Sequence, residues 1–395
     1  MSLSIGIGFS QNLDVQEAAK EAAFQSKTDL KEDRIDLSFV FSTVHYPPEK
    51  TLPVLNRVLK DTKRIGSSTA GIITGNGIFK RGIAVLTIAS DEAVFGTALV
   101  EQVNDFDTFH IGATLAQQTI QELGSHPRQA FLFFMDDRLH HTSNLLKGMQ
   151  QTFGNVFPVI GAGSSDDFRF ENNFQIFNQH SFSGAIAGLL IGGQTAVGIG
   201  ARHGWRPLGK PRILNEVEGH IIKQIDGKNP MHLYQEYFGD EAKAIGQHRL
   251  GNMSILYPLG VHIEGSSEYM LRNTIGMRPD GSILCQGDLP IGAEIHLMIG
   301  NKASCKQAAR EAALEAKENL LGKEPKLVLI LESLSRLKLL GREAHKEIEI
   351  VRDIFGADVP LVGMYSNGEV SPFQTIERFK KSHHLNESIV VMALA

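Results

Sequence analysis

The sequence predicts an α/β protein that consists of three αβαβ units with parallel strand pairs and flanking hairpins, plus a β-rich insert. Three observations support this fold class. Short apolar runs typical of buried strands occur at 38–42, 130–134 and 327–331. An alanine-rich helical stretch precedes each run, and a second apolar strand that ends in a glycine turn follows it. This recurrence indicates one structural unit used three times.

Each unit contains two predicted helices, because apolar residues recur three or four positions apart among strong helix formers. The first helices are expected at 15–27, 111–123 and 304–321. The second helices are expected at 48–60, 142–153 and 342–355. Since each second helix lies between two strands, the chain has enough residues to return and pair those strands in parallel.

The second strand of each unit runs into a turn rich in glycine and small polar residues. The turns are IGSSTAG at 65–71, IGAGSSDD at 160–167 and VGMYSNGE at 362–369. The third residue after the first glycine always carries a hydroxyl group, as Thr69, Ser164 and Ser366. Such residues beyond the carboxyl end of a strand let the backbone approach a ligand closely. We therefore expect a binding cleft where the three turns converge.

The remaining segments complete the predicted organisation. The stretches 82–100 and 184–202 alternate or are apolar and are interpreted as hairpins, and 388–393 is a last strand. Short strands separated by turn signals fill 205–300, with one helix at 231–238. We therefore divide the chain into two units at 1–204, a β-rich connecting region at 205–300 and a third unit at 301–395.

Composition narrows the function. The 395 residues carry a formal net charge of only −5, which makes nucleic acid an improbable main partner. No apolar run approaches the length of a membrane span, and no export signal is visible at the N-terminus. Cys285 and Cys305 lack zinc-site spacing and suit a reducing compartment. We expect a cytoplasmic protein.

Several linked motifs follow one another in a recognisable order. They are GSSTAG from Gly66, GSSDDFRF from Gly163, RHGWRPLG from Arg202, YMLRN from Tyr269, SRLKLLGR from Ser335, GMYSNGEVSP from Gly363 and HLNESIVVMAL from His384. This order resembles that of FIST proteins and spans nearly the whole chain. The resemblance assigns 1–204 to an N-terminal FIST domain and places the start of the C-terminal FIST domain in 205–300.

The resemblance implies a sensory module of bacterial signal transduction. It implies a small ligand, either an amino acid or a small carboxylate, and a separate signalling partner such as a histidine kinase. Some members of similar layout are haem proteins that sense nitric oxide and regulate a histidine kinase, so haem is an alternative. Where many relatives carry a Ser-Cys-x-x-Arg pattern, this chain has Glu332, Ser333 and Arg336, which argues against a thiol-dependent role at that position.

Polar residues of the turns are the first candidates for ligand contacts. The segment 164–169 combines hydroxyl, carboxylate and guanidinium groups, which suit the amine and carboxylate of a zwitterion. The alternative is a capped turn in which these side chains bond nearby backbone groups. Glu369 could meet a ligand amine or could cap a neighbouring loop. Arg272 and Arg336 could clamp a carboxylate or could pair with structural acidic residues.

The complete set of predicted ligand residues is Ser67, Ser68, Thr69, Ser164, Ser165, Asp166, Asp167, Arg169, Arg272, Arg336, Tyr365, Asn367 and Glu369. Among the 15 histidines, His203 has the most pocket-like surroundings and is the candidate haem ligand. A hydrolase or transferase that uses Ser164 or Ser165 with Asp166 is a further alternative. No serine lies in a nucleophile elbow with an assignable histidine, so we predict a binding module and not an enzyme.

Overall fold

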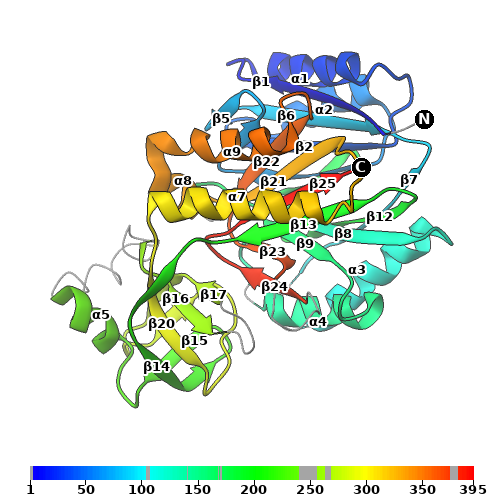
Figure 1. Ribbon diagram of the computed structural model, residues 1–395. Helices are drawn as coiled ribbons and strands as arrows, with labels where there is room; N and C mark the ends of the chain where they lie inside the picture. The colour runs from blue at the N-terminus through cyan, green and yellow to red at the C-terminus, as the bar shows by residue number, and fades with distance from the viewer. Residues whose placement is uncertain are drawn as a thin grey trace.

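The computed structural model describes residues 3–103, 107–139, 141–167, 169, 171–239, 256–262, 268–373 and 381–395. Within these residues the chain forms three six-stranded sheets and one seven-stranded sheet. Figure 1 shows the six-stranded sheets and their helices as one body, with the seven-stranded sheet beside it. The α/β fold class is therefore confirmed.

Three units with the same order of elements build the α/β body. The first contains β1 (Ser4–Ser10), α1 (Val15–Leu30), β2 (Leu37–Thr43), α2 (Pro48–Leu59), β3 (Arg64–Thr69), β4 (Ile72–Thr74), β5 (Gly77–Phe79) and β6 (Ile83–Ala89). The second contains β7 (Ala93–Val100), α3 (Thr108–Leu123), β8 (Arg128–Met135), α4 (Thr142–Phe153), β9 (Val159–Gly163), β10 (Gln175–Phe177), β11 (His180–Phe182) and β12 (Ile186–Gly193).

The third unit is interrupted by the β-rich insert. Its elements are β13 (Val197–Arg202), α7 (Lys302–Glu318), β21 (Leu327–Ser333), α8 (Leu334–Leu340), α9 (His345–Phe355), β22 (Leu361–Ser366), β23 (Glu369–Pro372), β24 (Ser382–Leu385) and β25 (Ile389–Leu394). A short 3-10 turn, Gly341–Glu343, joins α8 to α9. The insert enters between β13 and α7, where the other units have only a short connection.

Each unit forms a parallel strand pair, as predicted. These pairs are β2 with β3, β8 with β9, and β21 with β22. Helices α2, α4 and α9 lie close to where the spacing predicted them, and α4 matches 142–153 residue for residue. Helix α8, between β21 and α9, was not predicted. Polar caps set the starts of two first helices: the Asp14 side chain accepts hydrogen bonds from the backbone at the start of α1, and Asn301 does so at the start of α7.

The units exchange hairpins in a ring. Hairpin β10–β11 of the second unit extends the first sheet beside β3, and β23–β24 of the third unit extends the second sheet beside β9. Hairpin β4–β5 of the first unit extends the third sheet beside β22. The three sheets therefore have the same strand arrangement, with every sheet completed by another unit.

The hairpins interpreted at 82–100 and 184–202 are not formed. Strand β6 pairs with β1 and β2 in the first sheet, whereas β7 pairs with β12 in the second sheet. In the same way, β12 belongs to the second sheet and β13 to the third. The strands lie where we expected them, but the two strands of each stretch belong to different sheets. The alternation of apolar residues along a strand does not show which strand it pairs with, so it cannot distinguish this arrangement from a hairpin.

One hydrophobic core fills the space between the three sheets. Residues from all three contribute to it, including Phe39, Phe134 and Leu329. Outer clusters bury the helices against the sheets: α1 and α2 on the first, α3 and α4 on the second, and α7 and α9 on the third. Every sheet is thus covered on both faces, which explains why its central strands are apolar throughout.

The insert has a core of its own. It contains β14 (Arg206–Glu218), β15 (Ile221–Ile225), α5 (Met231–Phe238), β16 (Leu259–His262), β17 (Tyr269–Arg272), β18 (Thr274–Met277), β19 (Ile283–Cys285) and β20 (Glu294–Ile299). Its antiparallel strands pair in the order β17-β16-β20-β14-β15-β19-β18 and bury a separate cluster with α5. The helix predicted at 231–238 is confirmed. No helix among the described residues is long and apolar enough to span a membrane.

Candidate functional site

Backbone hydrogen bonds join the three glycine turns to one another. The Ser165 N–H donates to the Ser68 carbonyl (3.1 Å), which joins the second turn to the first. The Asn367 N–H donates to the Gly163 carbonyl (3.2 Å), which joins the third turn to the second. The residues after β3 and those at the end of β22 exchange two further backbone bonds of 3.3 and 3.0 Å. The three turns therefore meet.

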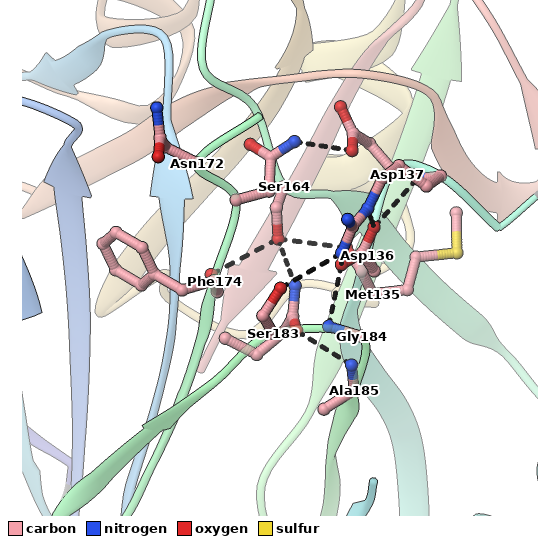
Figure 2. A network of polar contacts seen from close by, with 12 residues as sticks. Met135, Asp136, Asp137, Ser164, Asn172, Phe174, Ser183, Gly184 and Ala185 are labelled. Carbon is pink, nitrogen blue, oxygen red and sulfur yellow. Dashed lines mark hydrogen bonds and ion pairs between the residues drawn. The ribbon is translucent and has the colours of Figure 1, made fainter. Parts of the chain in front are cut away.

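The hydroxyl groups of these turns bond to one another and to the backbone. Ser67 Oγ lies 2.8 Å from Ser164 Oγ, and Gln175 Nε2 donates to Ser164 Oγ (2.7 Å). Ser164 also contacts the Met135 carbonyl (3.0 Å), so it lies within a closed polar network (Figure 2). Both serines are fully buried, so they join units and do not line a cleft.

Ser68, Thr69 and Ser165 are buried in the same region. Ser68 Oγ accepts a hydrogen bond from the Phe174 N–H (3.1 Å), and Thr69 Oγ1 donates to the Tyr365 carbonyl (2.8 Å). Ser165 Oγ has no hydrogen-bond partner among the described residues. These contacts hold hairpin β10–β11 and the third unit against the first.

The aspartates after β9 serve the loop that follows them. The Asp166 carboxylate accepts three backbone N–H bonds, from Arg169 (3.0 Å), Glu171 (2.8 Å) and Asn172 (3.0 Å). This arrangement is the capped turn that the sequence allowed as an alternative. Asp167 lies at the surface in an ion pair with Lys338 (2.5 Å), and Arg169 is exposed.

Asp137 is a junction residue that sequence analysis missed. Its two carboxylate oxygens accept hydrogen bonds from Asn173 Nδ2 (2.6 Å) and from Asn367 Nδ2 (2.8 Å), so it links the second and third units. Burial raises the pKa of Asp137 to about 7. Figure 2 shows it beside Asp136, whose carboxylate is held by Arg138 and the Gly184 N–H. Its position directly after a buried strand was the available signal.

Glu369 is fully buried at the start of β23. Its carboxyl group contacts the hydroxyls of Ser366 (2.7 Å) and Ser388 (2.8 Å), and burial raises its pKa to about 8. This geometry corresponds to the loop-capping alternative. A raised pKa means that folding favours the protonated acid, so the stability that Glu369 contributes is complete below about pH 4.5 and is lost as the pH rises toward 8.

The variant Glu369→Gln is therefore expected to flatten the pH dependence of stability. Glutamine resembles the protonated acid, so the variant's free energy of unfolding should exceed that of the parent. The difference should grow from roughly 1 kcal/mol at pH 5 to roughly 4 kcal/mol at pH 8. Chemical denaturation at the two pH values measures this difference. The exposed Glu349→Gln on α9 is the control. If Glu369→Gln changes the free energy of unfolding by the same amount at both pH values, Glu369 does not have the raised pKa that we assign to it.

Arg336 and Tyr365 belong to a buried acidic cluster. The Arg336 guanidinium forms ion pairs with Glu332 (3.4 Å) and Glu347, and its Nη2 donates to the Cys305 carbonyl (2.9 Å). All three charged side chains are fully buried. Burial and the neighbouring Glu347 raise the pKa of Glu332, and burial together with Glu332 raises the pKa of the Tyr365 phenol. Arg336 therefore pairs with structural acidic residues, which is the second of the two alternatives that the sequence allowed for it.

Arg272 differs from Arg336 in its partners. It ends β17 and is only 2% exposed, and burial lowers its pKa to about 10, so it stays charged at neutral pH. Its Nε donates to the Asp288 carbonyl (2.9 Å), and its Nη1 donates to the carbonyls of Leu271 (2.8 Å) and His384 (3.1 Å). Among the described residues no carboxylate forms an ion pair with this guanidinium.

A cavity of about 480 Å³ lies beside Arg272. Its walls are formed by helix α4 of the second unit, by loops of the insert and by strand β24 of the third unit. Its described lining residues are His141, Ser143, Asn144, Leu146, Lys147, Gln150, Gly219, Met270, Arg272, Asp288, Leu289, Pro290, Lys381, Ser382, His383 and His384. Of the predicted ligand residues, only Arg272 is among them. Its volume falls within the range of small-molecule sites, about 300–1,000 Å³.

His384 is a second buried group in the cavity wall. It is 4% exposed, and neither ring nitrogen has a hydrogen-bond partner among the described residues. Burial and the Arg272 charge lower its pKa to about 3, so the imidazole is neutral. Gly287 and Gly368 enclose the ring, since a Cβ at either position would lie 2.7 or 2.6 Å from a ring nitrogen. Both glycines have positive φ, which excludes most other residues.

Neither His203 nor His384 has a ring nitrogen placed to ligate haem iron. His203 Nδ1 accepts the Trp205 N–H (2.9 Å), and its Nε2 lies 3.1 Å from Glu268, so both nitrogens are engaged. The glycine backbones lie against both nitrogens of His384. His140 lies outside the described residues. Among those described, no group of three or more His, Cys, Asp or Glu side chains is arranged to hold a metal ion.

Comparison with known proteins identifies the two halves of the chain. Residues 36–228 match the FIST N domain, and residues 230–372 match the FIST C domain. The boundary between the matches falls inside the insert. An uncharacterized protein of Mycobacterium bovis, Mb0898c, is 21% identical over 378 residues, which cover 94% of each chain. The uncharacterized protein MJ1623 of Methanocaldococcus jannaschii is 24% identical over 55% of this chain and 46% of its own length.

A solved structure, that of cyanuric acid hydrolase from A. caulinodans, aligns with 49% of this chain and 71% of its own. Its sequence identity is 8% and its TM-score is 0.29, so this likeness supports no conclusion. The two domain matches together cover most of the chain, and they agree with the order of motifs along it. This chain belongs to the FIST family, whose N and C domains mark it as a sensory or signal-transduction module.

Proposed function

We propose that this protein senses a small ligand with a carboxylate group, an amino acid or a small carboxylic acid, in the cavity beside Arg272. The single observation that supports this most strongly is a buried, charged guanidinium at the wall of a cavity that no described carboxylate contacts directly, although the Asp288 charge acts on it through space. A buried charge without a counter-charge is costly, and an anionic ligand relieves that cost.

The contrast with Arg336 supports this choice of site. Both arginines are fully buried, but Arg336 forms ion pairs with Glu332 and Glu347 and is not among the described residues that line this cavity. The Arg272 side chain donates its described hydrogen bonds to backbone carbonyls, which supply no negative charge. A carboxylate is the partner that a guanidinium binds most strongly, through two parallel hydrogen bonds.

The position of the cavity supports a sensory role. Helix α4 belongs to the second unit, Arg272 to the insert and β24 to the third unit. A ligand that contacts all three stabilises one relative arrangement of these parts and so shifts the population of conformers. In the proposed function a separate signalling protein, such as a histidine kinase, reads this shift. We place the module in the cytoplasm, since Cys285 and Cys305 are both free.

A thermal-shift screen of amino acids and small carboxylic acids tests the proposal. A ligand at 100 times its dissociation constant is expected to stabilise the protein by about 2.7 kcal/mol. The screen should include esters or amides of each compound that shifts, because these lack the negative charge. Stabilisation by the acids but not by their amides is the expected result. No shift with any acid, or equal shifts with the amides, would reject this ligand class.

A further inference from the structure

The described lining of the cavity carries an excess of positive charge. Arg272, Lys147 and Lys381 are cations, whereas Asp288 is the only carboxylate among these residues. Asp288 already contacts His141 Nδ1 at 3.0 Å. Three cations and one carboxylate give these described residues a net charge of +2, so one ligand carboxylate would neutralise only part of it.

The cations also lie at different depths on different elements. Arg272 is 2% exposed at the end of β17, whereas Lys147 on α4 and Lys381 before β24 are exposed. A ligand that reaches both the buried arginine and the exposed lysines therefore needs two anionic groups that are separated along its length. A single carboxylate can satisfy only one end.

Two of the three histidines in the described lining, His383 and His384, add no positive charge to the cavity. Burial and the charges of Lys381 and Arg272 lower the pKa of His383 to about 4, and burial and Arg272 lower that of His384 to about 3. Both imidazoles are therefore neutral at physiological pH. The His384 ring therefore lies beside Arg272 without adding charge.

We propose that the ligand is a small dianion, with one anionic group held at Arg272 and the second held by Lys147 and Lys381. A dicarboxylate or a phosphorylated carboxylate has this chemistry. The inference rests on the proposed function and specifies its ligand class. It disfavours a zwitterionic amino acid, because an ammonium group at the mouth would meet two lysines, and Asp288 is already in contact with His141.

Calorimetric titration at low salt with a matched series of compounds tests this inference. The series is acetate, glycine, succinate and 3-phosphonopropionate. Each dianion is expected to bind at least tenfold more tightly than acetate, with an affinity that falls as salt is added. Whichever dianion binds more tightly identifies the second anionic group. Glycine is expected to bind no more tightly than acetate.

The double variant Lys147→Gln with Lys381→Gln locates the second anionic group. It is expected to lower succinate affinity at least tenfold and so narrow the difference between succinate and acetate. The control, Lys50→Gln with Lys323→Gln, changes net charge equally at exposed lysines that do not line the cavity. The control should keep the preference for succinate.

The outcomes separate the two levels of the proposal. Three results would overturn the dianion while leaving an anion site at Arg272. They are equal affinity for acetate and succinate, tighter binding of glycine than of succinate, and an equal loss of succinate binding in both double variants. Binding of none of these compounds would overturn the dianion, and together with no shift by any acid of the thermal-shift screen it would reject the proposed function itself.

Discussion

Replacing Arg272 with glutamine is expected to remove ligand binding almost completely. The substitution keeps a polar side chain of similar reach but deletes the positive charge at the buried end of the cavity. Loss of one partner from a buried, hydrogen-bonded charge pair costs about 2–5 kcal/mol. We therefore expect ligand affinity to fall by roughly 30-fold or more, since each 1.4 kcal/mol is a factor of about ten. Calorimetric titration with the best ligand from the screen measures this.

Arg64→Gln is the matched control for this variant. Arg64 is equally buried, and burial also lowers its pKa to about 10. It lies on β3, contacts Asn56 and the Asn178 carbonyl, and does not line the cavity. The control should lose thermal stability but keep the ligand affinity of the parent. If Arg272→Gln folds and binds the ligand as tightly as the control does, the proposed site is wrong.

Arg336→Met is expected to have the largest effect on stability. Arg336 is the described counter-charge that contacts both Glu332 and Glu347 inside the third unit. Removal of one partner from a buried ion pair typically costs about 3–5 kcal/mol, because a charge is left without compensation. Without the guanidinium the pKa of the Glu332 carboxyl group, which burial and Glu347 already raise, rises further. The stability deficit should therefore be smaller at pH 5 than at pH 8, because protonation relieves the repulsion at low pH.

A triple variant keeps this prediction testable if Arg336→Met alone does not fold. Combining it with Glu332→Gln and Glu347→Gln removes the carboxylates along with their counter-charge, and replacement of a whole buried ion cluster is often close to neutral. We expect the triple variant to recover at least half of the lost free energy of unfolding and to lose the added pH dependence. This account would be contradicted if the free energy of unfolding fell by less than about 1 kcal/mol in the single variant, or if the triple variant were no more stable than the single one.

The sequence predicted the local elements well because their signals are local. Helix spacing placed α4 and α5, and apolar runs placed the paired strands β2, β8 and β21. Three copies of one pattern also predicted that the glycine turns have equivalent positions. The division at 1–204, 205–300 and 301–395 stays a prediction, although β13 already belongs to the third sheet.

The exchange of hairpins could not be predicted in the same way. Hairpin β10–β11 has the same local pattern whether it pairs with its own unit or with β3 of the first unit. The choice depends on contacts between distant segments, such as Ser67 with Ser164. The interpretation of 82–100 as a hairpin was wrong because strand pairing depends on distant segments: β6 pairs with β1, and β7 pairs with β12.

The cavity could not be predicted because no continuous segment forms it. Its cations come from α4, β17 and the residue before β24, which are more than 100 residues apart in places. Sequence analysis selected Arg272 as a possible carboxylate clamp, but it did not select Lys147, Lys381 or His384. The hydroxyls of the turns were selected for ligand contacts, and the structure places them in contacts between units. Their role as ligand residues stays a prediction.

A crystal structure of the protein with succinate, or with the tightest compound of the screen, tests the central claim most directly. We predict a carboxylate of the ligand within hydrogen-bonding distance of the Arg272 guanidinium, in the cavity between α4, β17 and β24. A ligand bound instead among the three turns, against Ser165 and Asn367, would contradict the proposed site.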